Sequence, residues 1–162
     1  YVEAAEFIRS CPRTLDIESL LEPIQHPTNL NIISYYKDIF VDIVVEPNVH
    51  GQCFLVTEKL WRAIIARRPF IVMSNRNYLA NLKRLGFKTF DLWWDESYDE
   101  FAEEHRIHKI SSILDQISQW TVLELEEKLV AMSEVLSYNY NNFIKLTPNQ
   151  INKVFNESVP LC

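Results

Sequence analysis

Glycine is scarce in this sequence, which has only two glycines in 162 residues. The sequence contains no Gly-x-Gly-x-x-Gly stretch, no P-loop and no nucleophile elbow. These motifs use glycine where the backbone must approach a ligand closely or make a strained turn. Dehydrogenase, nucleoside-triphosphatase and hydrolase functions that depend on these motifs are therefore excluded.

Cysteine and long apolar runs are also scarce. The three cysteines, Cys11, Cys53 and Cys162, are too scattered for a disulfide framework or a zinc site. No apolar run approaches the roughly 20 residues that span a bilayer, and the N-terminus lacks the pattern of a signal peptide. We expect a soluble protein of a reducing compartment, the cytoplasm, with no membrane association.

The composition is that of a folded domain. Hydrophobic residues make up 48% of the chain and aromatic residues 12%. A chain of this length buries roughly two-thirds of the surface that it exposes when unfolded. The net charge of -6 argues against the basic surface of a general nucleic-acid binder.

Charge is unevenly distributed along the chain. Residues 57–88 contain eight Lys or Arg and one acid, whereas residues 91–104 contain seven acids and no base. One interpretation is a basic pocket for an anion with an acidic rim. The other is a pair of oppositely charged faces that pair with each other or are simply solvated.

Short apolar runs alternate with helical patterns in the first 100 residues. We expect strands at 31–37, 39–45, 70–73 and 87–90, and helices at 58–66 and 77–85, with Thr57 capping the first helix and Gly86 ending the second. A short helix is also expected before Pro12. Alternation with short connections is typical of parallel βαβ units. The sequence therefore predicts an α/β fold with a Rossmann-like parallel sheet.

Helical periodicity dominates the rest of the chain. We expect helices over 101–119, 122–137 and 148–155. The predicted organisation is a Rossmann-like unit over residues 1–100, followed by a helical C-terminal extension over residues 101–162 that packs on it.

The start of the helix at residue 58 is the first candidate for a binding site. In parallel sheets, ligands bind beyond the carboxyl ends of the strands, where helix N-termini attract anions. Lys59 could neutralise a diphosphate there, and Glu58 could accept hydrogen bonds from ribose hydroxyls. Taken alone, Thr57-Glu58-Lys59 is also an ordinary helix cap.

The local sequence adds to this candidate. Val45-Glu-Pro-Asn48, followed by Leu55-Val-Thr-Glu-Lys-Leu-Trp-Arg62, resembles the α-1,3-fucosyltransferase family. The resemblance implies the donor-binding half of an enzyme with two Rossmann domains, in which the Glu-Lys pair contacts the ribose and phosphates of GDP-fucose. It implies these donor-binding residues: Glu46, Asn48, Thr57, Glu58, Lys59 and Arg62. The chain also resembles a group of uncharacterised viral and phage proteins, through Glu58-Lys59, Pro69-Phe70, Leu85-Gly-Phe-Lys-Thr-Phe90 and Asp95-Glu-Ser-Tyr-Asp99. For a viral protein the expected compartment is the host cytoplasm.

Two functions follow from this resemblance. The first is a glycosyltransferase that uses a nucleotide-diphosphate sugar as its donor substrate, needs no further cofactor, and transfers the sugar to a hydroxyl of an acceptor such as a glycan. Because 162 residues are too few for the whole enzyme, and the chain begins at Tyr1 without Met, we expect an upstream domain to supply the acceptor site and the catalytic base. The alternative is a non-catalytic structural or interaction module that keeps the fold, in which side chains fill the pocket or Lys59 is paired internally. Outside this resemblance, a third hypothesis is an enzyme of phage type that acts on a small molecule or a nucleic acid.

Other candidate sites have simpler interpretations. An acidic group (Asp95, Glu96, Asp99, Glu100) lacks the spacing of a calcium loop, and His105 and His108 have no third ligand nearby in the sequence. We expect no metal. Four tryptophans could stack a base or sugar but are more often buried for their area. They are Trp61, Trp93, Trp94 and Trp120.

Overall fold

The computed structural model describes residues 30–47, 54–147, 149–150 and 153. The chain divides into two compact units, residues 1–30 and 31–162, and the elements below belong to the second apart from the first residue of η2. They are η2 (Leu30–Asp38), β1 (Asp42–Val45), α2 (Glu58–Ile65), β2 (Phe70–Met73), α3 (Tyr78–Arg84), η3 (Glu96–Glu100), α4 (Glu103–Ser118), α5 (Val122–Ala131) and α6 (Ser133–Lys145). The helix expected before Pro12 lies outside the described residues. Most residues of the helix expected over 148–155 also lie outside them.

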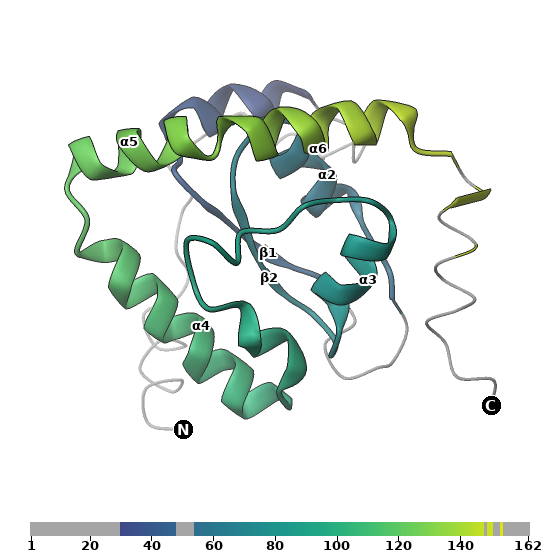
Figure 1. The fold of residues 1–162 in the computed structure, drawn as a ribbon, viewed down its shortest axis with the longest axis horizontal. Coiled ribbons are helices and arrows are strands. Elements are labelled where there is room, and N and C mark those ends of the chain that lie inside the picture. The colour runs from purple at the N-terminus through teal and green to yellow at the C-terminus, as the bar shows by residue number, and fades with distance from the viewer. Residues whose placement is uncertain (1–29, 48–53, 148, 151–152, 154–162) are drawn as a thin grey trace, which may run out of the picture. The chain divides into compact units, whose positions relative to one another are not determined.

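The predicted α/β class is confirmed at a coarse level. β1 and β2 pair in parallel, from Asp42 opposite Phe70 to Val45 opposite Met73, and α2 connects them. A helical segment follows, and the described chain is mostly helical. In the view of Figure 1, α6 lies above the two strands and α4 lies below them.

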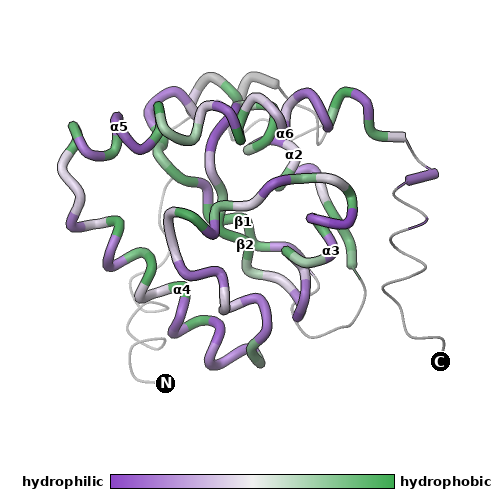
Figure 2. Tube along the Cα trace, in the orientation of Figure 1, coloured by the Kyte–Doolittle hydropathy of each residue, from purple (hydrophilic) through white to green (hydrophobic). Residues whose placement is uncertain are grey.

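The core is built around β2. Its residues Phe70, Ile71 and Val72 are buried, as expected for a strand covered on both faces. Leu60, Ala63 and Ile64 of α2 are also buried, so the apolar face of this helix covers the strands. Figure 2 shows the resulting contrast between the hydrophobic strands and the mixed hydrophobic and hydrophilic trace of α4.

The prediction of a strand over 31–37 is wrong, because this segment is the 3-10 helix η2. Two groups of Tyr36 are held by distant residues: its hydroxyl donates to Asp42 Oδ2 at 2.6 Å, and its carbonyl accepts from Arg68 Nε at 2.6 Å. Arg68 also donates to the carbonyl of Lys37 at 3.0 Å. These tertiary contacts stabilise a compact turn where the local β propensity favours a strand.

The prediction of a strand over 87–90 is also wrong. Asn139 of α6 accepts from the Lys88 N–H at 2.8 Å and donates to the Lys88 carbonyl at 2.9 Å. Glu96 accepts from the Phe90 N–H at 2.7 Å. Side chains therefore occupy the backbone groups that a neighbouring strand would have used.

The helical segment differs from the prediction at one point. The helix expected over 122–137 is two helices, α5 and α6, which meet at Met132, and α6 continues to Lys145. Met132 is fully buried, so the joint between the helices is anchored in the core. α6 packs against α2, and α4 packs against β2 and η3.

Candidate functional site

The carboxyl ends of β1 and β2 form the edge at which the candidate site was predicted. The Glu46 N–H, just after β1, donates to the carbonyl of Met73, the last residue of β2, at 3.0 Å. The segments that leave the two strands therefore begin side by side. In parallel α/β proteins this edge is where ligands bind.

Glu46 is a buried carboxylate at this edge, with 1% of its surface exposed. Its Oε1 accepts from the Thr57 N–H at 3.0 Å and from the Tyr78 hydroxyl at 3.2 Å, and its Oε2 accepts from the Thr57 hydroxyl at 2.6 Å. Hydrogen bonds to a charged group are stronger than those between neutral groups. Glu46 thus fixes the start of α2 and the start of α3 relative to the end of β1.

Thr57 is the N-cap of α2, as predicted. Its Oγ1 accepts from the Lys59 N–H at 3.4 Å, and its backbone is extended with φ -103°. This leaves Glu58 and Lys59 in the first turn, next to the positive end of the helix dipole.

Lys59 and Glu58 form an ion pair at the surface. Lys59 Nζ lies 3.4 Å from Glu58 Oε1 and 3.4 Å from Thr57 Oγ1. The two charged side chains are 43% and 37% exposed. The pKa of Glu58 is lowered, chiefly because its own backbone N–H bonds its carboxylate and to a smaller degree because of Lys59.

Arg62 lies one turn further along α2. Its charge lowers the pKa of Glu58 and that of Asp42, although burial outweighs it at Asp42 and leaves the pKa of Asp42 raised. Arg62 therefore acts electrostatically on the first residue of α2 and on the first residue of β1. Asn48 lies outside the described residues, so the structure gives no position for it.

Several residues of this edge were missed by the sequence analysis. Tyr78 contacts Glu46, and burial together with the charge of Glu46 raises the pKa of its phenol. Ser74 and Asn75 follow β2 directly and are both 2% exposed, and the Ser74 hydroxyl donates to Asn75 Oδ1 at 3.1 Å. Their position right after a predicted strand was the signal that could have found them.

The free N–H groups at the start of α3 donate to the carboxylate of Asp99. Asp99 Oδ1 accepts from the Leu79 N–H at 2.9 Å, and Oδ2 accepts from the Ala80 N–H at 3.1 Å. Burial raises the pKa of Asp99, and these backbone hydrogen bonds oppose the rise. This part of the acidic stretch therefore caps a helix.

Three further acids of the stretch, Asp91, Asp95 and Glu96, pair with basic residues, in line with the second interpretation of the charge pattern. Lys83 Nζ lies 2.9 Å from Asp91 and 3.8 Å from Glu96, and Lys109 Nζ lies 3.0 Å from Asp95. Much of the apparent basic and acidic surface is thus neutralised within the fold.

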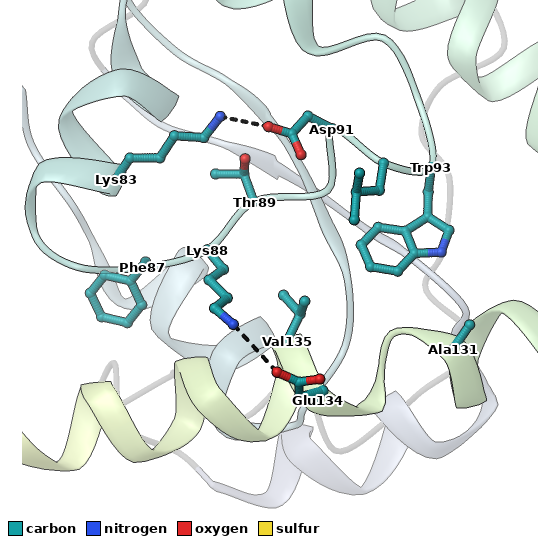
Figure 3. A pocket seen from close by; sticks show the side chains of 10 residues that line it. Lys83, Phe87, Lys88, Thr89, Asp91, Trp93, Ala131, Glu134 and Val135 are labelled. Carbon is teal, nitrogen blue, oxygen red and sulfur yellow. Dashed lines mark hydrogen bonds and ion pairs between the residues drawn. The ribbon is translucent and has the colours of Figure 1, made fainter.

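A cavity of about 540 Å³ lies between the segment after α3 and the start of α6 (Figure 3). Lys83 and Lys88 line it, but Asp91 holds Lys83, and Glu134 lies 3.6 Å from Lys88 Nζ. Both ammonium groups are therefore already neutralised by neighbouring carboxylates. These surface pairs are as exposed as the Lys59–Glu58 pair, so they do not by themselves exclude an anion from this cavity.

The histidines, acids and tryptophans considered as candidate ligands lie in the following places. Within the described residues, no three His, Cys, Asp or Glu side chains are grouped to hold a metal ion. His105 and His108 line a surface hollow of about 250 Å³ on α4. Trp94 is 4% exposed and packs on Phe90 with ring centroids 5.3 Å apart, which is a core contact.

Comparisons with protein-family models, curated proteins and solved structures gave no match to this chain. In the part of the chain that the structure describes, no helix is long and apolar enough to cross a membrane.

Proposed function

We propose that this chain binds the donor of a nucleotide-sugar-dependent glycosyltransferase, as a Rossmann-like half of an enzyme with two such domains. The observation that supports this proposal best is the double hydrogen bond between Glu46 and Thr57, at 3.0 and 2.6 Å. It ties the first turn of α2, with Glu58 and Lys59, to the carboxyl end of β1. This is the position in which α/β proteins bind nucleotides.

The chemistry of the first turn suits a diphosphate. Lys59 is partly exposed, and its only carboxylate contact within the described residues is the surface pair with Glu58. Such a pair contributes little stability, at most about 1 kcal/mol. A diphosphate with two negative charges would displace Glu58 from Lys59, and the freed carboxylate would accept hydrogen bonds from the ribose hydroxyls.

Sugar transfer needs more than a donor site. A general base must take the proton from the acceptor hydroxyl. Glu46 does not suit this role, because its carboxylate is buried and both of its oxygens accept hydrogen bonds from the chain itself. We assign the base and the acceptor site to a second α/β domain of the enzyme, which also binds the acceptor glycan or other hydroxyl compound.

A second candidate is a non-catalytic structural or interaction module. The Lys59–Glu58 pair is the observation in its favour, because this candidate predicts that Lys59 is paired within the chain. The two candidates make opposite predictions about binding, and one titration separates them.

The experiment is calorimetric titration of the chain with nucleoside diphosphates and nucleotide sugars carrying each common base. The donor proposal expects saturable binding to part of this panel, weakened about tenfold in Lys59→Ala, which corresponds to about 1.4 kcal/mol. Lys37→Ala is the matched control, because Lys37 forms a similar surface pair with the adjacent Asp38 at 3.9 Å. Absence of binding across the panel would favour the module.

A further inference from the structure

The turn between β2 and α3 contains a buried amide with an unused donor. Asn75 is 2% exposed, and its Oδ1 accepts from the Ser74 hydroxyl. Among the residues that the structure describes, none accepts a hydrogen bond from Asn75 Nδ2, and this atom is not sealed from solvent. Because this donor reaches solvent, a ligand that approaches this edge of the sheet can accept a hydrogen bond from it.

The next residue, Arg76, is an exposed cation without a counter-ion in the described part of the chain. Other basic residues of the 57–88 stretch have partners there. Lys59, Lys83 and Lys88 face carboxylates. Arg67 lies over the Tyr140 ring at 4.4 Å, and Arg68 donates to backbone carbonyls. Arg76 therefore has its charge available for a ligand.

A second arginine lies buried beside the turn. Arg106 is 2% exposed and donates to the carbonyls of Ser74, Tyr98 and Phe101. Burial is the main cause that lowers the pKa of Arg106, the carboxylates of Asp99 and Glu103 oppose this, and the like charge of Arg76 adds a smaller lowering. Arg106 is thus occupied within the fold, and the charge that a ligand would meet at this turn is that of Arg76.

Side chains, and not helix N–H groups, are what this turn offers to a ligand. Asp99 already accepts from the Leu79 and Ala80 N–H groups at the start of α3. The turn also lies close to Glu46, which holds the first turn of α2. Val45 is the register partner of Met73, so Glu46 and Ser74 leave neighbouring strands, which lie about 4.8 Å apart.

We propose that Arg76 and Asn75 form the second wall of the donor site, opposite Lys59. The Arg76 guanidinium binds the diphosphate, because its fork of N–H groups matches phosphate oxygens. The Asn75 carboxamide donates to a hydroxyl of the transferred sugar. This inference rests on the proposed donor-binding function and assigns a role to residues that the resemblance does not include.

Three variants test the assignment: Arg76→Ala, Asn75→Ala and, as a control, Arg84→Ala, an arginine at the opposite end of α3. Each is titrated with inorganic pyrophosphate, with the nucleoside diphosphate that wild type binds, and with the corresponding nucleotide sugar. Arg76→Ala should weaken all three ligands about tenfold. Asn75→Ala should weaken the nucleotide sugar about fivefold and leave the diphosphate unchanged, since only the sugar contact is lost. Arg84→Ala should bind like wild type.

Thermal denaturation of each variant shows whether it is folded, and Asn75→Asp, which keeps the side-chain volume, replaces Asn75→Ala if that variant unfolds. The added charge of Asn75→Asp repels both ligands, so with the fold retained a greater loss for the nucleotide sugar than for the nucleoside diphosphate supports the assignment, and equal losses contradict it. If wild type binds nucleotide sugars and Arg76→Ala binds them equally well, the second wall is refuted while the donor function stands. If wild type binds no member of the panel, both proposals fail together.

Discussion

Glu46 and Thr57 are joined through both oxygens of one carboxylate, although eleven residues separate them in the chain. The carboxylate is buried, so its charge is stabilised by these hydrogen bonds and the one from Tyr78, and not by water. The pair determines where α2 begins. It is therefore the contact on which the geometry of the candidate site depends.

Thr57→Val should reduce the free energy of unfolding by about 1.5 to 3 kcal/mol, because it removes a hydrogen bond to a buried charge. Urea denaturation measures the loss. Thr121→Val is the matched control: Thr121 caps α5 with a capping box at the surface, and its loss should cost about 1 kcal/mol. Equal losses in the two variants would show that the Glu46 contact adds nothing to ordinary capping.

Gly86 ends α3 in a left-handed conformation with φ +86°. The Gly86 N–H donates to the Lys83 carbonyl at 2.9 Å, and the Phe87 N–H donates to the Leu82 carbonyl at 3.2 Å, which together form a Schellman motif. An added Cβ would meet Asn142 at an ordinary 3.5 Å, so the cost of a side chain is in the backbone conformation.

Gly86→Ala should therefore lower stability by about 1 to 2 kcal/mol, measured by thermal denaturation. Gly86→Asn should lie between glycine and alanine, because asparagine adopts the left-handed conformation more readily. A variant with alanine as stable as wild type would refute the backbone explanation.

Local patterns predicted the elements whose causes are local. Thr57 and Glu58 indicated the start of α2, and the structure begins this helix at Glu58. The apolar run 70–73 is β2, and Gly86 follows the end of α3 with a positive φ. Capping, burial of a short run and a left-handed glycine all act within a few residues, so the sequence alone was sufficient.

The errors arose where distant side chains decide the backbone. Asn139 lies 51 residues from Lys88, and no local pattern indicates that it will bond both backbone groups of Lys88. For the same reason no local pattern indicates that Glu46 binds Tyr78, 32 residues away. The first turn of α2 was predicted from its motif, whereas Asn75 and Arg76 stand out only once the partners of neighbouring residues are known.

Asn139→Ala should destabilise the fold by about 2 kcal/mol, because it removes two hydrogen bonds that hold the segment after α3 against α6. Asn141→Ala is the control on the same helix, since Asn141 is exposed. Amide hydrogen exchange at Lys88 gives a second measurement: its N–H should exchange faster in Asn139→Ala and unchanged in Asn141→Ala. Unchanged protection at Lys88 in both variants would contradict the role of Asn139.

Asp95 should control part of the acid sensitivity of the fold. Asp95 Oδ1 accepts a hydrogen bond from the Ser97 N–H at 2.9 Å. This hydrogen bond is the main reason why the pKa of Asp95 is lowered to about 2, and the nearby Lys109 ammonium lowers it further. A carboxyl group with a lowered folded pKa binds fewer protons than in the unfolded chain, where its pKa is about 3.9. Its contribution is therefore present above about pH 4 and is lost as the pH falls toward 2.

Asp95→Asn should accordingly flatten the fall in stability between pH 5 and pH 2, measured as the urea midpoint at each pH. Because Asp95 and Lys109 are both largely exposed, with side chains 58% and 44% accessible, the effect should be small and should shrink further in high salt. Asp115→Asn, at an exposed aspartate of α4, is the control and should leave the pH profile unchanged. An Asp95→Asn profile parallel to that of wild type would show that this carboxylate gains nothing from capping η3.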